Sequence, residues 1–282
     1  MYRYLMGMMG KLKVNKTLIL FLFLCISSLA VAQVSVCSWN IMNLGKSKSD
    51  SELSVMANTL KEYDVIAIQE VVAGLGGAQA VSRLVTLLNT KGTKWDYTIS
   101  NPTTSNNPSS SERYAFLWKT ARIKKVGTTW LDQNYATVID REPFMGTFEF
   151  QGKIFTLVSF HAVPKKKNPE TELKYFKFFP KLYPKLNLIF VGDFNCPQSN
   201  TVFNPLKKIG FTPILVSQKT SLRQKCNNND CLASEYDNLF YDNQKIKILQ
   251  KGIIAFYHNF KSIKEARKIS DHVPIWCVME IK

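Results

Sequence analysis

Short apolar runs recur along the sequence, and most of them end directly before a residue with an acidic, amide or imidazole side chain. Runs of about four to eight residues with many β-branched and aromatic side chains predict β-strands. We expect strands over residues 34–39, 65–68, 97–100, 114–118, 144–150, 153–160, 186–191, 238–241 and 275–280. This pattern constrains the fold strongly, because apolar strands are stable only where another layer of structure covers them.

Four stretches between these runs place apolar residues at helical spacing. The first has a predicted cap at Asp50 or Ser51 and an apolar stripe at positions 53, 56, 57 and 60. The others cover residues 80–88, ending near Gly92, then residues 169–179, and residues 201–209, which Pro205 interrupts. Helices mixed with strands, without strict βαβ alternation, predict an α/β sandwich in which helices cover the sheets.

The N-terminal segment has the pattern of a targeting sequence. Residues 1–16 carry four cations and no acid, and the apolar run over 17–32 ends in Ala30-Val31-Ala32. This order is typical of a secretory signal peptide, with cleavage after Ala32. The alternative is an uncleaved membrane anchor, for which the run is short, since a span needs about 20 residues. We expect a signal peptide at 1–32, one domain over 33–282, and a secreted or periplasmic protein without stable membrane insertion.

The exported chain is strongly basic. Cleavage removes four cations and no acid, so the net charge falls from +16 to +12. Such a charge attracts polyanions, although it also serves solubility alone. Five cysteines remain after cleavage; Cys226–Cys231 and Cys196–Cys231 are competing disulfides, and sequence spacing does not decide between them. We expect a monomer.

The polar residues that follow the apolar runs are the candidate functional residues. They are Asn40, Glu70, His161, Asp193, Asn195, Asp237, Asp271 and His272. Taken singly, each has an ordinary interpretation as a strand-end or turn residue. If the strands pack together, however, these side chains meet at the rim of the sheets. Gathered carboxylates repel one another unless a cation lies among them, and oxygen ligands favour Mg²⁺ or Ca²⁺. With two imidazoles for proton transfer, this set predicts metal-assisted hydrolysis of a phosphate ester.

The same segments resemble those of a known family. The matching stretches are SWNIMNLG, DVIAIQEV, SERYAFLW, DREPFMGTF, LVSFHAVP, IFVGDFNCP, SEYDNLF and ISDHVPI, in family order. The sequence is similar to the endonuclease/exonuclease/phosphatase superfamily and, within it, to the deoxyribonuclease I-like branch. The resemblance implies a four-layered α/β sandwich, in which two packed mixed β-sheets are flanked by helices.

The resemblance also implies roles for individual residues. His161 would be oriented by Glu112, and His272 by Asp237, with one imidazole assisting the attacking water and the other the departing oxygen. Asp193 would act beside them. The implied substrate-binding residues are Arg141 and Asn195, and the alternative for Arg141 is a surface ion pair with Glu142 or Asp140. The implied metal ligands are Asn40, Glu70, Asp193, Asn195 and Asp271, with Mg²⁺ as the expected ion and Ca²⁺ or Mn²⁺ as alternatives.

The sequence departs from the branch at three points. Val72 occupies the place of an arginine that enters the DNA minor groove, and serines at 109–111 replace a tyrosine that stacks on deoxyribose. Leu232 occupies the place of a threonine upstream of Asp237. Lysines at 165–167 and in the stretch KYFKFFPKLYPK are expected to attract phosphate, whereas Leu173, Phe176 and Phe179 are expected to pack inward.

These features predict an exported, divalent-metal-dependent endonuclease that hydrolyses DNA phosphodiester bonds by a two-histidine mechanism. RNA is the alternative nucleic acid. A phospholipid or inositol-phosphate phosphohydrolase, similar to a sphingomyelinase, is the alternative enzyme, because the reacting group is the same. A weaker alternative is a non-catalytic nucleic-acid-binding member, which would require a broken catalytic set.

Overall fold

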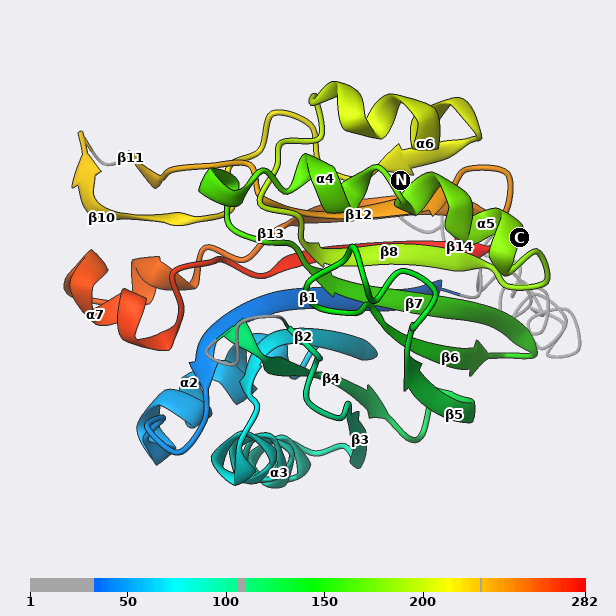
Figure 1. The fold of residues 1–282 in the computed structure, drawn as a ribbon. Coiled ribbons are helices and arrows are strands. Elements are labelled where there is room, and N and C mark those ends of the chain that lie inside the picture. The colour runs from blue at the N-terminus through cyan, green and yellow to red at the C-terminus, as the bar shows by residue number, and fades with distance from the viewer. Residues whose placement is uncertain (1–32, 106–109, 229) are drawn as a thin grey trace, which may run out of the picture. The chain divides into compact units, whose positions relative to one another are not determined.

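The computed structural model describes residues 33–105, 110–228 and 230–282, so the predicted signal peptide lies outside the described residues. Two six-stranded mixed sheets face each other (Figure 1). The first sheet has the order β13-β14-β1-β2-β4-β3, and the second has the order β5-β6-β7-β8-β12-β9. The first comprises β1 (Gln33–Leu44), β2 (Val65–Val72), β3 (Trp95–Ile99), β4 (Glu112–Lys119), β13 (Ile246–Ile253) and β14 (Ile275–Ile281). The second comprises β5 (Lys124–Leu131), β6 (Phe144–Phe150), β7 (Lys153–His161), β8 (Leu188–Asp193), β9 (Phe211–Pro213) and β12 (Asp237–Asp242).

Helices cover the outer face of each sheet. On the first sheet these are α2 (Asp50–Leu60), α3 (Leu75–Asn89) and α7 (Ile263–Ile269), whose apolar residues share one core with β1, β2 and β4. On the second sheet they are α4 (Glu170–Leu173), α5 (Phe179–Leu182) and α6 (Asn204–Lys208). Short 3-10 turns occupy Lys165–Lys167, Phe176–Phe178, Thr201–Phe203 and Phe256–Asn259. The predicted four-layered sandwich is therefore confirmed, and in the described residues no helix has the length and apolar character of a membrane span.

Side chains from both sheets fill the space between them. The rings of Phe116 (β4) and Phe144 (β6) stack at 4.9 Å, and Phe148 meets Phe116 edge-on at 5.5 Å. Nearby, Gln69 Nε2 donates to Ser159 Oγ across the interface at 2.9 Å. This buried hydrogen bond joins the two sheets and helps to set how they are aligned.

The central strands run parallel in both sheets. β1 pairs with β2 in parallel, and so does β7 with β8. The β7–β8 pair is close enough to require Gly192, since a Cβ there would lie 2.0 Å from the Phe160 carbonyl oxygen and the backbone φ is +136°. The C-terminal halves of these four strands carry Asn40, Glu70, His161 and Asp193.

Two local predictions differ from the structure. The cap of α2 is Ser49 rather than Asp50 or Ser51; its hydroxyl accepts from the Glu52 N–H in a capping box. The single helix expected over 169–179 is instead α4, a 3-10 turn and the start of α5, which holds a proline at its first turn. Leu173, Phe176 and Phe179 are buried, as expected.

A disulfide closes the separate two-stranded hairpin formed by β10 (Leu222–Asn227) and β11 (Asp230–Leu232). The bond joins Cys226 to Cys231, so the alternative pairing of Cys196 with Cys231 is wrong. Cys196 is free and buried, as are Cys37 and Cys277.

Candidate active site

The strand ends bring the predicted residues to one edge of the sandwich. From the first sheet come Asn40 (β1), Glu70 (β2), Glu112 (β4) and His272, which precedes β14. From the second come His161 (β7), Asp193 (β8) and Asp237 (β12). β4 and β12 are antiparallel to their neighbours β2 and β8, so their first residues lie at the edge where β2 and β8 end.

Asp193 lies at the centre of this group. Its Oδ2 atom is 3.5 Å from His161 Nε2 and 3.6 Å from His272 Nε2. Its Oδ1 atom accepts the Asn195 backbone N–H at 2.8 Å. Burial opposes ionisation of this carboxyl. The two imidazoles, together with hydrogen bonds from Asn195 and Asn40, outweigh burial and hold the pKa of Asp193 below its usual range. A fully buried carboxylate thus faces both imidazoles.

The His161 ring is fixed by Glu112. Nδ1 of His161 lies 2.9 Å from Glu112 Oε2, and Arg141 donates to the same carboxylate at 3.0 Å. Burial disfavours the charge on Glu112, yet His161 and Arg141 outweigh it and lower the pKa of Glu112. Burial and Arg141 both oppose protonation of His161, but Glu112 and Asp193 raise its pKa above the ordinary value. The bond at Nδ1 leaves Nε2 directed at Asp193.

The His272 ring is fixed by Asp237 in the same way. Nδ1 of His272 lies 2.7 Å from Asp237 Oδ2, which also accepts from the Thr220 hydroxyl at 2.6 Å. Burial opposes the charge on His272, but Asp237 and Asp193 outweigh it and raise the pKa of His272 well above its usual value. This hydroxyl comes from Thr220, which lies further upstream than Leu232. Thr220 could not be recognised in the sequence, because an isolated threonine in a loop has no distinguishing pattern.

Each imidazole is paired with a carboxylate from the opposite sheet. His161 belongs to the second sheet and Glu112 to the first, whereas His272 lies just before β14 of the first sheet and Asp237 belongs to the second. Both pairs therefore depend on how the two sheets are aligned.

Glu70 lies at a break in the strand pattern. The register between β2 and β4 shifts between Ile68 and Val71, and Glu70 has a left-handed φ of +60°. Such a conformation costs about 1–3 kcal/mol for a residue with a side chain and is concentrated at functional sites. Its Oε2 atom accepts the Asn43 N–H at 3.1 Å, and the carboxylate is about one quarter exposed. The bulge therefore turns this carboxylate toward the cavity described below.

Asn40 and Glu70 fit a divalent cation. Nδ2 of Asn40 donates to Glu70 Oε1 and to Asp193 Oδ2, each at 3.1 Å, while its Oδ1 atom is buried and has no hydrogen-bond partner. An unpartnered buried oxygen beside two carboxylates is the donor chemistry that Mg²⁺ or Ca²⁺ prefers. Asp193, Asp237 and His272 form another group that could hold a metal ion, since their ligand atoms lie within 4.8 Å of one another.

Arg141 and Asn195, the two predicted substrate-binding residues, lie in the same region. Arg141 is not in a surface pair with Glu142 or Asp140; it is buried, bonded to Glu112 and to the Ala162 carbonyl oxygen, and its Nε has no partner. Asn195 Nδ2 donates to the same carbonyl at 3.0 Å.

Asp271 lies at the rim, where its carboxylate is 3.5 Å from an Arg267 guanidinium nitrogen. It lines the same cavity as Glu70 and Asp193, and its role as a metal ligand stays a prediction.

These residues line a cavity of about 600 Å³. Its walls include Glu70, Glu112, Arg141, His161, Asp193 and His272, and Lys167 lies at its edge. A polar cavity with two oriented imidazoles, an arginine and several carboxylates is suited to binding a phosphate ester and transferring protons to and from its oxygens.

A family model described as the endonuclease/exonuclease/phosphatase family matches residues 37–272. The chain belongs to this family. The match spans every residue of the group around Asp193, so the resemblance inferred from the motifs is confirmed.

Two relatives are similar over most of their length. A deoxyribonuclease of Thioalkalivibrio sp. (strain K90mix) is 26% identical, covering 93% of this chain and 75% of the relative. Deoxyribonuclease gamma of Homo sapiens is 25% identical, covering 90% and 88% respectively. Among solved structures, the human Nocturnin catalytic domain with bound sulfate has a TM-score of 0.62 at 15% identity, covering 89% of this chain and 96% of that one. That structure supports the fold alone.

Proposed function

We propose that this chain is an exported endonuclease that requires a divalent cation and hydrolyses phosphodiester bonds in DNA. The observation that carries the proposal is the pair of imidazoles, each fixed by its own carboxylate, with Nε2 atoms 3.5 Å and 3.6 Å from one atom of Asp193. The two relatives named as deoxyribonucleases and the basic charge of the exported chain support DNA as the substrate.

Different residues bind the phosphate, transfer the protons and orient the imidazoles. Arg141 and Asn195 bind the scissile phosphate, and their fixed positions orient it in the cavity. One imidazole removes a proton from the attacking water, and the other gives a proton to the departing oxygen. Glu112 and Asp237 keep Nε2 of each ring available and stabilise the ring when it is charged.

A cation held by Glu70 and Asn40 would supply positive charge to offset the charge that develops on the phosphate. Since Asn40 Nδ2 also contacts Asp193, the cation and the imidazoles would share one polar network. Substitution of Asn40 is therefore expected to affect both cation binding and the position of Asp193.

Supercoiled plasmid tests the activity directly. The protein that begins at Gln33 should nick plasmid in Mg²⁺ and not in chelator, while His272→Ala and Asn195→Ala should remove nicking and keep the circular dichroism of the unmodified protein. The matched control is Lys247→Gln, an exposed lysine of β13 that pairs in register with Glu280, at the opposite end of the sheet from the site. Absence of nicking at any pH in Mg²⁺, Ca²⁺ or Mn²⁺ would refute the proposal.

The same protein should be assayed in parallel on RNA and on sphingomyelin. Faster release of phosphocholine than nicking of DNA would favour the lipid enzyme instead. Binding of DNA without cutting of any substrate would favour the non-catalytic alternative.

Export has its own test. When the full chain is produced with its N-terminal segment, we expect the protein outside the cytoplasm to begin at Gln33. Recovery of the intact N-terminus in the membrane fraction would instead support an uncleaved anchor.

A further inference from the structure

A second cavity adjoins the candidate active site on the side of His272. It measures about 630 Å³ and shares Asn195, Asp271 and His272 with the first cavity. The lining residues that the first cavity lacks come mainly from β10 and from Arg267 of α7. The hollow surface around the site therefore continues beyond His272, along residues that have not yet been given a role.

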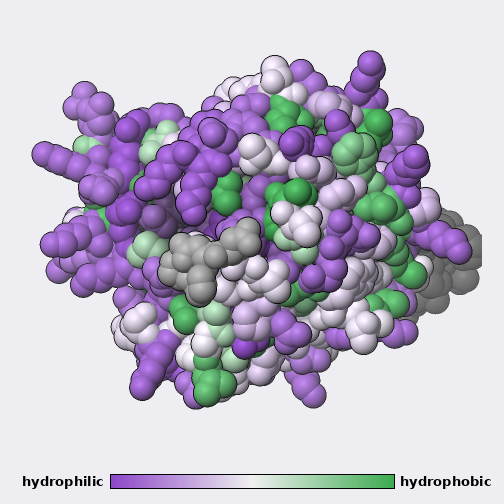
Figure 2. Space-filling view, in the orientation of Figure 1, coloured by the Kyte–Doolittle hydropathy of each residue, from purple (hydrophilic) through white to green (hydrophobic). Residues whose placement is uncertain are grey.

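Cations dominate the walls of this second cavity. Arg223, Lys225 and Arg267 line it, against the single carboxylate of Asp271. Arg223 and Lys225 both line it from β10. Figure 2 shows that the part of the surface formed by β10, β11 and α7 in Figure 1, at the left of the view, is mostly hydrophilic.

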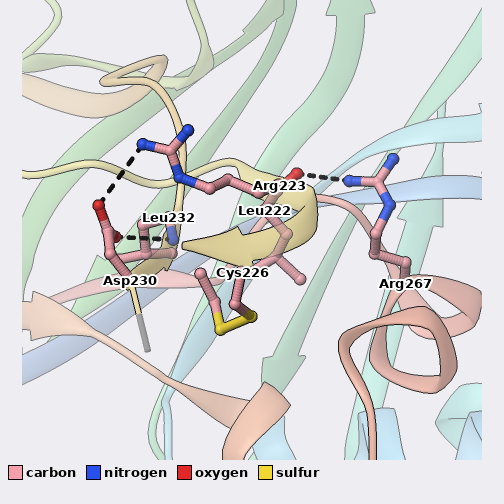
Figure 3. The surroundings of a disulfide bond; sticks show 7 residues. Leu222, Arg223, Cys226, Asp230, Leu232 and Arg267 are labelled. Carbon is pink, nitrogen blue, oxygen red and sulfur yellow. Dashed lines mark hydrogen bonds and ion pairs between the residues drawn. A yellow bond between two sulfur atoms is a disulfide. The ribbon is translucent and has the colours of Figure 1, made fainter. Parts of the chain in front are cut away.

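The guanidinium groups are only partly neutralised. Arg223 lies 3.5 Å from Asp230, which is shared with Lys219 at 2.8 Å, and Arg267 lies 3.5 Å from Asp271. The Arg223 side chain is 36% exposed, so its guanidinium can still be reached from the cavity. Arg267 donates to the Leu222 carbonyl oxygen, as Figure 3 shows. Donors that remain available on fixed guanidinium groups are suited to a phosphate.

The hairpin that carries these cations is attached to the segment that carries His272. The Leu222 N–H donates to the Asp271 carbonyl oxygen at 2.6 Å, and Ser221 forms a β-bridge with His272. At the other end the Cys226–Cys231 disulfide joins the two strands, and in Figure 3 it leaves β10 in the direction opposite to Arg223. The cations of β10 are therefore held at a fixed position relative to the imidazole.

We propose that Arg223, Lys225 and Arg267 form a subsite for the phosphate of a polynucleotide strand that neighbours the scissile phosphate on the His272 side. The proposal rests on the proposed nuclease function and deepens it. A substrate that fills both cavities must carry phosphates on both sides of the reacting imidazoles. The subsite thus favours an internal phosphodiester over a small diester or a terminal phosphate. It also offers positive charge to DNA although Val72 lacks the cation that the related branch places in the minor groove.

The test compares a long and a short substrate. The Arg223→Gln variant should lower kcat/KM on a duplex oligonucleotide about tenfold, mainly through KM, and the fold-loss on bis(p-nitrophenyl) phosphate should be at least threefold smaller. Affinity for DNA falls as salt rises, and each phosphate contact adds about 0.9 to the steepness of log K against log salt. A plot of log(kcat/KM) against log salt should therefore be less steep by about 1 for Arg223→Gln than for the unmodified protein. Arg223→Lys should recover part of the loss, and Lys247→Gln is the control for a distant positive charge.

A second variant tests the role of the hairpin. Cys226→Ser/Cys231→Ser should raise KM for the oligonucleotide while the small diester is affected less. Equal losses on both substrates for Arg223→Gln, or the same loss for Lys247→Gln, would refute the subsite. Failure of the unmodified protein to hydrolyse either substrate would refute the proposed function itself, which is a distinguishable result.

Discussion

Replacement of Glu112 by glutamine separates the electrostatic role of this residue from its shape. The Glu112 side chain is 9% exposed and that of Arg141 is 8% exposed, and the carboxylate also contacts His161. Removing one member of a buried ion pair costs about 3–5 kcal/mol, because the partner charge stays buried. Since glutamine keeps the size and one acceptor oxygen, we expect about 3 kcal/mol of lost stability, which is roughly a hundredfold in the unfolding equilibrium.

Urea unfolding at neutral pH measures this loss, and plasmid nicking should fall by about a hundredfold or more because the His161 ring is no longer fixed by a carboxylate. Glu149→Gln is the matched control. Its carboxylate lies 3.7 Å from Lys124 in an exposed pair, so the same substitution should cost about 0.5 kcal/mol or less.

The contribution of Glu112 to folding stability depends on pH, and the shift in its pKa sets the direction of that dependence. Burial opposes the charge on Glu112, but His161 and Arg141 prevail and lower its pKa, so the folded state binds the proton more weakly than the unfolded chain. The stabilisation is therefore fully present above the unfolded pKa of about 4.3 and is lost as pH falls through the lower folded pKa. The stability difference between the unmodified protein and Glu112→Gln should shrink over that range. A difference below about 1 kcal/mol at pH 7, with full nicking activity, would refute the reasoning.

Three further outcomes follow from the structure. Thr220→Val removes the hydroxyl that Asp237 accepts, so we expect about 1–2 kcal/mol of lost stability in urea and a slower reaction in the nicking assay; unchanged values would show that the hydroxyl does not position Asp237. Gly192→Ala places a Cβ against the Phe160 carbonyl oxygen, so soluble protein with a normal thermal midpoint would contradict the close approach of β7 and β8. Mg²⁺ at about 100 times its Kd should stabilise the protein by about 2.7 kcal/mol in calorimetry, and Asn40→Ala should abolish this shift; an equal shift in the variant would exclude Asn40 as a ligand.

The central strands were predictable from the sequence because they are apolar on both faces. The run LIFVGD of β8 is buried throughout, and its pattern requires cover on both sides. By contrast, β13 and β5 were not predicted. Both are edge strands, and lysines, glycine or exposed residues interrupt their apolar patterns. An edge strand is defined by its neighbour more than by its own residues.

The site was predictable to the extent that its residues end strands. Glu70, His161 and Asp193 each follow an apolar run, and parallel neighbours necessarily end at the same edge. Thr220, which contacts Asp237, and Arg223, which lines the adjoining cavity, were not recognised. Their positions depend on how the segment around Ser221 pairs with the segment around His272. Their sequence separation from that segment hid the contact.

The crossed pairing of imidazoles and carboxylates has a consequence for assembly. A chain in which only one sheet has formed possesses neither complete pair, because His161 and His272 each require a partner that the other sheet supplies. Hydrolysis is therefore a property of the docked sandwich alone. During refolding, the return of hydrolysis would report the moment when the two sheets meet. If the chain is the exported nuclease proposed above, molecules that are still partly folded would not cut the DNA of the cell that makes them.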